Sequence, residues 1–191
     1  MPILRALLTT LLIALPGTAL AHTGHGSVSG FGAGLLHPFT GLDHVLAMVA
    51  VGLLGVQIGA RAIWALPLAF MSVMLACAAA AQAGVLPLPA VEFGILLSVL
   101  VLGGLVAFGR PLPQVLALGL VGLFAMFHGH AHGAEAPATA RGLLYGLGFL
   151  STTGMLHASG LGLGSTLGQL GRRDALRYAG LGIVVLGLGV A

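Results

Sequence analysis

The sequence predicts an all-α protein that crosses a membrane several times. Hydrophobic residues make up 58% of its 191 residues, charged residues make up only 6%, and the mean hydropathy is +1.11. Because the surface of a soluble domain needs several times more charge, one membrane domain is predicted. The net charge of +3 is spread over scattered arginines, and the chain has no lysine. The lipid bilayer is therefore an expected partner, and nucleic acid is not.

The first 21 residues have the pattern of a cleavable signal peptide. Arg5 supplies a positive start, residues 6–15 are an apolar core, and residues 19–21 read Ala-Leu-Ala, a cleavage pattern. Residues 22–191 are then the mature membrane domain, which begins at His22. The new terminal amine, the His22 imidazole and nearby His25 form a candidate metal-capturing arm, although a merely solvated tail explains them equally well.

Six further apolar segments each approach the roughly 20 residues that a helix needs to cross the hydrocarbon core. The connections between them are rich in glycine and proline, and the last connection is predicted over residues 160–171. The six predicted transmembrane helices cover residues 34–56, 62–83, 89–108, 113–132, 141–160 and 174–191.

Arginine placement predicts the orientation of these helices. Five arginines fall at alternate connections, and only Arg141 lies on the other side. The positive-inside rule then places the five in the cytoplasm and both ends of the mature chain outside, in agreement with an export signal. The five are Arg61, Arg110, Arg172, Arg173 and Arg177.

The first span opens with residues 37–44, His-Pro-Phe-Thr-Gly-Leu-Asp-His. On a continuous helix His37 and His44 share one face, with Gly41 between them. Imidazoles and the Asp43 carboxylate are costly inside a bilayer and indicate a functional site. The alternative interpretation is a polar network that locks helices together.

A second polar cluster ends the fourth span. His128 and His132 are one turn apart, which suits chelation of a borderline divalent metal, and Glu135 follows one turn later if the helix continues that far. His130 points elsewhere. The predicted topology puts this cluster and residues 37–44 in the outer half of the membrane, so we expect them to be adjacent.

Two further residues have weaker signals. His157 shares a helix face with Thr153 in the inner half of the fifth span and is a candidate later station on an ion path. A hydrogen-bonded structural histidine is nearly as good an explanation. Glu92 opens the third span, where we expect it to sit at the membrane interface.

Both clusters resemble signatures of the HupE/UreJ family. Residues 37–44 match a histidine followed after five residues by Asp-His, and residues 127–135 match Phe-His-Gly-x-Ala-His-Gly-x-Glu. The resemblance implies a multi-pass permease of the bacterial inner membrane, so that the outward N-terminus predicted from the arginines lies in the periplasm. Such permeases take up nickel, or cobalt in some members, for hydrogenase or urease maturation proteins. The metal-binding positions that it implies are His37, Asp43, His44, His128, His132 and Glu135, with His130 at a variable position.

The predicted function is transport of Ni²⁺ or Co²⁺ from periplasm to cytoplasm by facilitated diffusion. The ion is cargo, and no prosthetic group or enzymatic activity is expected. Without lysine the chain cannot carry a Walker nucleotide-binding motif. Two alternatives stay open, namely a metal-dependent intramembrane hydrolase and a metal-binding sensor or storage module. The sequence also leaves the oligomeric state open, including a homo-oligomer.

Overall fold

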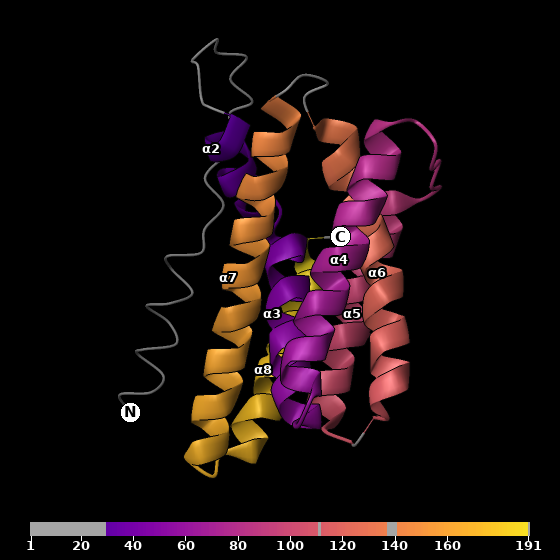
Figure 1. Cartoon of the computed structure of the whole chain (residues 1–191). Helices are drawn as coiled ribbons and strands as arrows, with labels where there is room; N and C mark the ends of the chain where they lie inside the picture. Colours follow the sequence, from indigo (N-terminus) through magenta and orange to yellow (C-terminus); the bar gives the residue numbers. More distant parts are fainter. Residues whose placement is uncertain (1–29, 111, 137–140, 191) are drawn as a thin grey trace.

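The computed structural model describes residues 30–110, 112–136 and 141–190, and in these residues the protein is all-helical (Figure 1). The predicted signal peptide, His22 and His25 lie outside the described residues. Within these ranges, seven α-helices and one short 3-10 helix, η1, follow one another. They are α2 (Gly30–Leu36), η1 (His37–Phe39), α3 (Leu42–Ile58), α4 (Ala62–Gln82), α5 (Val91–Phe108), α6 (Gln114–Glu135), α7 (Arg141–Gln169) and α8 (Arg173–Gly189).

The prediction of one continuous first helix over residues 34–56 is wrong. The chain bends by 80° between η1 and α3. Pro38 lies in η1 and has no N–H to donate, and Gly41 has an extended backbone with φ −116° and ψ 116°. The Thr40 N–H and hydroxyl both donate to the His37 carbonyl and close the turn. His37 and His44 therefore do not share a helix face.

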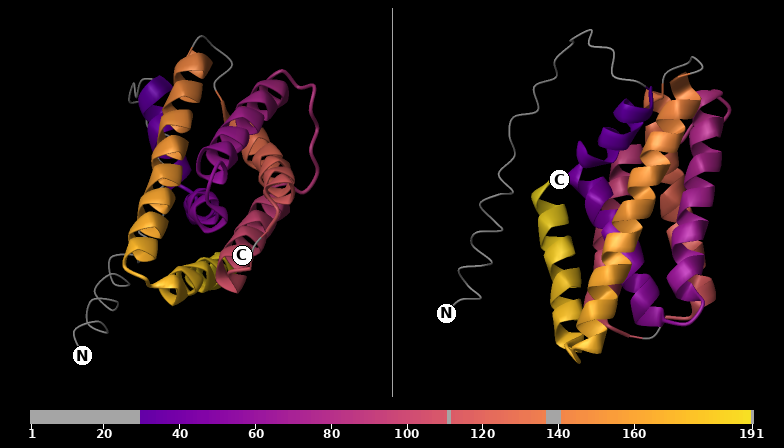
Figure 2. Two further views of the ribbon diagram at one scale, coloured as in Figure 1. Left: turned by 60° about the horizontal axis from the view of Figure 1, so that its bottom comes forward. Right: turned by 60° about the vertical axis from the view of Figure 1, so that its left-hand side comes forward.

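Helix α3 lies in the middle of the bundle. It packs against α4, α5 and α7, and the other helices surround it (Figure 2). Nearly every side chain from Leu46 to Gly55 is buried. A helix that is apolar on all sides is stable when it is enclosed by protein or by lipid, and α3 is enclosed by protein. Helix α3, whose first turn carries Asp43 and His44, is thus the helix most enclosed by protein.

Glycines let several helix pairs approach closely. A Cβ atom at Gly52 of α3 would overlap the carbonyl oxygen of His157 on α7, and one at Gly129 or Gly133 of α6 would overlap backbone carbonyls of α4. Small residues at such contacts are typical of helix packing in membranes. The contacts of Gly129 and Gly133 fix the turn of α6 that carries His128 and His132.

Among the helices that the structure describes, three are long and apolar enough to cross a membrane: α4, α5 and α6. The segments α2–η1 and α3 form a bent pair. If this pair is counted as a single broken span, it is a fourth candidate. Helix α7 is long enough but rich in glycine and hydroxyl residues, and α8 has only 17 residues. Large apolar side chains such as Trp64, Phe93 and Phe108 are exposed on the outside of the bundle, as expected for a surface that faces lipid.

The predicted glycine-rich connection over residues 160–171 is also wrong. Helix α7 continues to Gln169, because Gly160 and Gly164 pack against α3 instead of breaking the helix. The turn is limited to residues 170–172. It lies at the lower end of the bundle in Figure 1, together with the turns after α3 and α5. These turns carry Arg61, Arg110 and Arg172, so the predicted grouping of these arginines at one end is confirmed.

Candidate metal path

Four histidine rings meet near the opposite end of the bundle. The centroids of His37 and His132 are 4.9 Å apart, those of His44 and His132 are 5.1 Å apart, and those of His44 and His128 are 4.7 Å apart. His37 and His44 are 6.4 Å apart despite the bend. The predicted adjacency of the two clusters is therefore confirmed. We call these residues the four-ring cluster.

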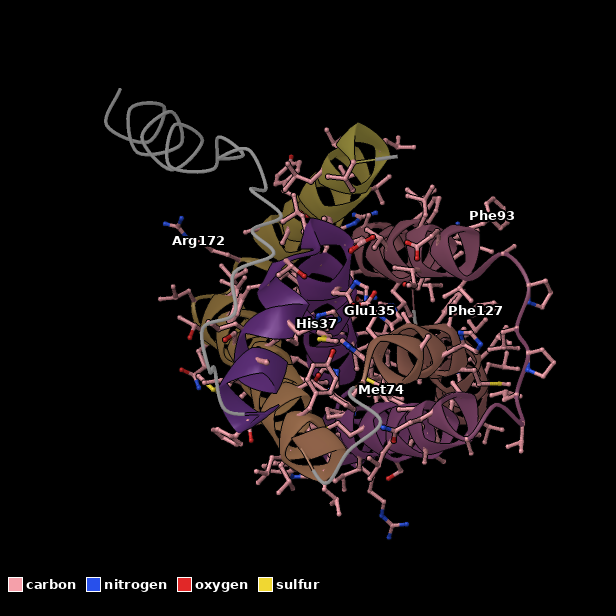
Figure 3. The ribbon with its side chains drawn as sticks, turned by 90° about the horizontal axis from the view of Figure 1, so that it is seen from above. His37, Met74, Phe93, Phe127, Glu135 and Arg172 are labelled. Atoms are coloured by element: carbon pink, nitrogen blue, oxygen red, sulfur yellow. The ribbon has the colours of Figure 1, made fainter. Side chains whose placement is uncertain are left out.

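Glu135 and His37 form the outer edge of this cluster. Helix α6 continues to Glu135 as predicted, and the Glu135 carboxylate lies 3.3 Å from Nε2 of His37. Glu135 is 62% exposed, whereas His37 is 19% exposed. In the view from above, both lie near the middle of the ring of helices, while Phe93 points outward (Figure 3). The pair therefore connects the exterior to the buried rings.

A cavity of about 180 Å³ lies at this edge and is lined by acidic side chains. Asp43, Glu92 and Glu135 line it together with His37 and His44. These are three of the four acidic residues in the chain. No arginine is among the described residues that line it. The prediction that Glu92 sits merely at the membrane interface missed this role, and the scarcity of acidic residues was the signal that could have revealed it.

Asp43 orients His44. The Asp43 carboxylate accepts hydrogen bonds from the His44 backbone N–H (2.7 Å) and from Nδ1 (2.9 Å). Because a carboxylate only accepts, Nδ1 carries the proton and Nε2 of the neutral ring keeps a free lone pair. Nε2 is buried and has no partner in the described part of the chain. A Cβ atom at Gly41 would lie 2.6 Å from the Asp43 oxygen, so only glycine leaves room for this pair.

Ser98 of α5 orients the His128 ring, as Asp43 orients His44. Its hydroxyl donates to the Ile95 carbonyl (2.6 Å) and lies 3.0 Å from Nε2 of His128. Since the single hydroxyl proton is used, Ser98 accepts from Nε2–H, and Nδ1 of the neutral ring is left with a free lone pair. Nδ1 is buried without a partner in the described residues. The sequence analysis missed Ser98, because a lone serine in an apolar helix has no distinguishing pattern.

His132 completes the set. It is fully buried, and its ring stacks on Phe149 with centroids 4.6 Å apart and an interplanar angle of 6°. Neither ring nitrogen has a partner among the described residues. A buried polar atom without a partner costs about 1–3 kcal/mol. Three imidazoles that each keep a buried nitrogen without a partner are therefore expensive unless a ligand binds them.

His157 lies apart from the four-ring cluster, on the far side of Phe70. The buried Phe70 ring contacts His128 at 5.4 Å and His157 at 5.2 Å between centroids. Both nitrogens of His157 and the hydroxyl oxygen of Thr153 are buried, with no partner in the described ranges. The alternative interpretation of His157 as a hydrogen-bonded structural histidine therefore has no hydrogen bond among the described residues to support it.

His130 points away from the other histidines, as predicted. Its Nε2 accepts a hydrogen bond of 3.4 Å from the Leu88 backbone N–H in the connection between α4 and α5. His130 therefore holds a loop and takes no part in the four-ring cluster.

The described side chains do not form a ready-made metal site. No three His, Cys, Asp or Glu residues among them have the geometry to hold one ion together. The candidate ligands instead form a series, from the carboxylate-lined cavity through the four-ring cluster to Phe70 and His157. A series of incomplete sites suits an ion that moves on, since conduction requires binding weak enough for release.

Comparison with known proteins agrees with these features. The family model described as "HupE / UreJ protein" matches residues 10–190. The chain is also 44% identical over 180 residues to Protein HupE of Rhizobium leguminosarum bv. viciae, covering 94% of this chain and 93% of the relative. No solved structure is significantly similar. The chain therefore belongs to the HupE/UreJ family.

Proposed function

We propose that this protein carries Ni²⁺ from the periplasm into the cytoplasm of a bacterium, across the inner membrane, and supplies metal for hydrogenase or urease maturation. The observation that carries the proposal is the meeting of three imidazoles, each with a buried nitrogen that has no partner among the described residues, beneath a cavity lined by three carboxylates. Membership of the HupE/UreJ family and the apolar helices support it. By the positive-inside rule, the arginine-bearing turns lie on the cytoplasmic side.

Capture of the ion begins at the cavity beside Glu135. Three carboxylates that line one cavity create a negative potential, which raises the local concentration of a divalent cation. The carboxylate oxygens of this cavity replace some of the water molecules that hydrate the ion. His37 lies 3.3 Å from the Glu135 carboxylate and offers the first imidazole.

The ion then reaches the buried rings of the four-ring cluster. His44 offers Nε2, His128 offers Nδ1, and His132 offers either nitrogen. Imidazole is a suitable ligand for nickel, although it suits zinc, copper and iron as well. The choice of nickel over these ions, and over cobalt, follows from the family resemblance.

Passage inward requires Phe70 to move. Its ring contacts both His128 and His157, so the ion cannot pass between these histidines while Phe70 keeps this rotamer. Rotation of the ring opens a route to His157, whose free nitrogens and the adjacent Thr153 oxygen receive the ion. An inside-negative potential drives a divalent ion inward by about 4–5 kcal/mol per 100 mV, so facilitated diffusion needs no coupled hydrolysis.

The series of sites favours this function over the two alternatives. A hydrolytic zinc centre needs three ligands closed around one metal with one open position. A storage or sensor site needs tight, stoichiometric binding. Both alternatives need a closed set of ligands, and no three His, Cys, Asp or Glu residues among the described ones form such a set.

Purified protein reconstituted into liposomes with an inside-negative potential is expected to accumulate ⁶³Ni²⁺ well beyond the stoichiometry of the protein. Collapse of the potential with an ionophore should slow the accumulation. Uptake that stops at about one ion per protein would support storage or sensing instead, and zinc-dependent peptide cleavage without ion flux would support the hydrolase.

A further inference from the structure

Tyr145 of α7 is a buried polar residue that the path described above does not use. It is 4% exposed, and its hydroxyl oxygen has no hydrogen-bond partner among the described residues. A buried polar atom of this kind is uncommon in proteins and is expected to bind a ligand or a water molecule. The other tyrosine of the chain, Tyr178, lies on α8 and is 70% exposed.

Four aromatic rings form a closed cycle of contacts that includes Tyr145. The centroid of the Tyr145 ring lies 5.6 Å from that of His37 and 5.7 Å from that of Phe149. Phe149 stacks on His132 at 4.6 Å, and His132 lies 4.9 Å from His37. Tyr145 therefore adjoins the step from His37 to His132, at which the ion leaves the outer edge and enters the buried rings.

Tight packing of α7 against α2 fixes this position. A Cβ atom at Gly34 of α2 would overlap the carbonyl oxygen of Tyr145. The Thr152 hydroxyl donates a hydrogen bond of 2.6 Å to the Leu35 carbonyl. Because α2 leads directly into η1, these contacts hold Tyr145 beside His37.

The cycle of rings lies between two different cavities. Tyr145, Phe149 and His132 line an apolar cavity of about 240 Å³, whereas His37 lines the acidic cavity together with Glu135. The Glu135 carboxylate also lies within electrostatic range of the Tyr145 hydroxyl. Tyr145 is therefore placed where the carboxylate-lined mouth of the path borders on apolar surroundings.

We propose that Tyr145 is a further positioning residue of the nickel path, whose hydroxyl oxygen accepts a hydrogen bond from a water molecule that the ion keeps as it passes from His37 to His132. This inference rests on the proposed function and deepens it, because it concerns the same site. It gives a role in ion entry to α7, a helix that supplies no imidazole to the four-ring cluster.

An ion at this step must keep some of its water. No three His, Cys, Asp or Glu residues among the described ones have the geometry to surround it. A divalent ion polarises its bound water and makes that water a stronger hydrogen-bond donor. A phenol oxygen can accept this bond, and neighbouring side chains of the apolar cavity, such as Leu143 and Leu147, offer no competing acceptor. The bond would satisfy the Tyr145 oxygen and stabilise the partly hydrated ion.

Tyr145→Phe removes only the hydroxyl and tests this role. Because one hydrogen bond to the water of the ion is lost, the external nickel concentration for half-maximal ⁶³Ni²⁺ influx into liposomes should rise about threefold to tenfold. The maximal influx rate should stay within about twofold of the parental rate, since saturating nickel compensates for weaker binding. Without nickel, the melting temperature should equal or exceed that of the parent protein, because the hydroxyl has no partner among the described residues to lose. A merely structural tyrosine would give a lower melting temperature and an unchanged half-maximal concentration.

Tyr178→Phe makes the same chemical change at the exposed tyrosine of α8 and should transport like the parent protein. An unchanged half-maximal concentration in folded Tyr145→Phe, or an equal shift in both variants, would overturn the role of Tyr145. A Tyr145→Phe protein that does not fold would overturn it as well, since its hydroxyl would then have a structural partner. Failure of the parent protein itself to accumulate nickel would instead overturn the proposed function, so the two failures are distinguishable.

Discussion

Replacement of His44 by alanine is expected to abolish nickel uptake, with a loss of about 100-fold or more in initial rate. His44 is in contact with His37, His128 and His132, and it takes part in three of the four ring contacts within the cluster. Removal of its imidazole takes away one free nitrogen and the link between the outer rings and His128. The measurement is ⁶³Ni²⁺ influx into liposomes that contain equal amounts of folded protein.

His130→Ala is the matched control for this experiment. His130 lies in the same turn of α6 as the ligand histidines but bonds to the Leu88 N–H, away from the cluster. We expect this variant to keep most of the parental influx. Normal influx by His44→Ala, or equal losses in both variants, would contradict the assigned path.

Asp43→Asn is expected to lower influx by about tenfold or more while the protein stays folded. The amide has almost the same shape as the carboxylate, so the helix start is preserved. The substitution removes one of the three charges of the cavity and replaces a charge-assisted hydrogen bond to His44 by a weaker neutral one. The loss should be largest at low nickel concentration and at low ionic strength, where electrostatic attraction contributes most.

Asp174→Asn makes the same chemical change at the other end of the bundle. Asp174 is exposed in the first turn of α8, beside the arginine-bearing turns, and lies outside the path. Its substitution should leave influx unchanged. If both aspartate variants lose influx equally, the effect reflects net charge and the role of Asp43 as a specific positioning residue is wrong.

Much of the candidate site could be predicted from sequence because polar residues are so rare in this chain. The periodicity of α6 correctly placed His128, His132 and Glu135 on one face and His130 on another. Alternate arginines correctly indicated which turns lie at one end of the bundle. Both inferences depend only on helix geometry, which apolar segments of this length reliably adopt.

The remainder depended on tertiary contacts that no local pattern encodes. His37 and His44 are expected from the sequence to be close because they would share a face of one helix. The chain instead bends by 80° between η1 and α3, and the two rings lie 6.4 Å apart across this bend. Ser98 and Phe70 are ordinary residues of apolar helices until a neighbouring histidine gives them a role. Because glycine has a low helix propensity, the glycines of α7 predicted that this helix would end early. Their packing against α3 outweighs the low propensity, and the helix continues.

The central claim is that a nickel ion binds among the buried rings of the four-ring cluster on its way inward. The most direct measurement is the position of the metal, located by anomalous X-ray scattering at the nickel edge in crystals of the nickel-loaded protein. The account predicts a nickel peak within ligand distance of Nε2 of His44 and of a ring nitrogen of His128 or His132. A nickel peak found only outside the bundle, with these nitrogens left without a metal, would contradict it.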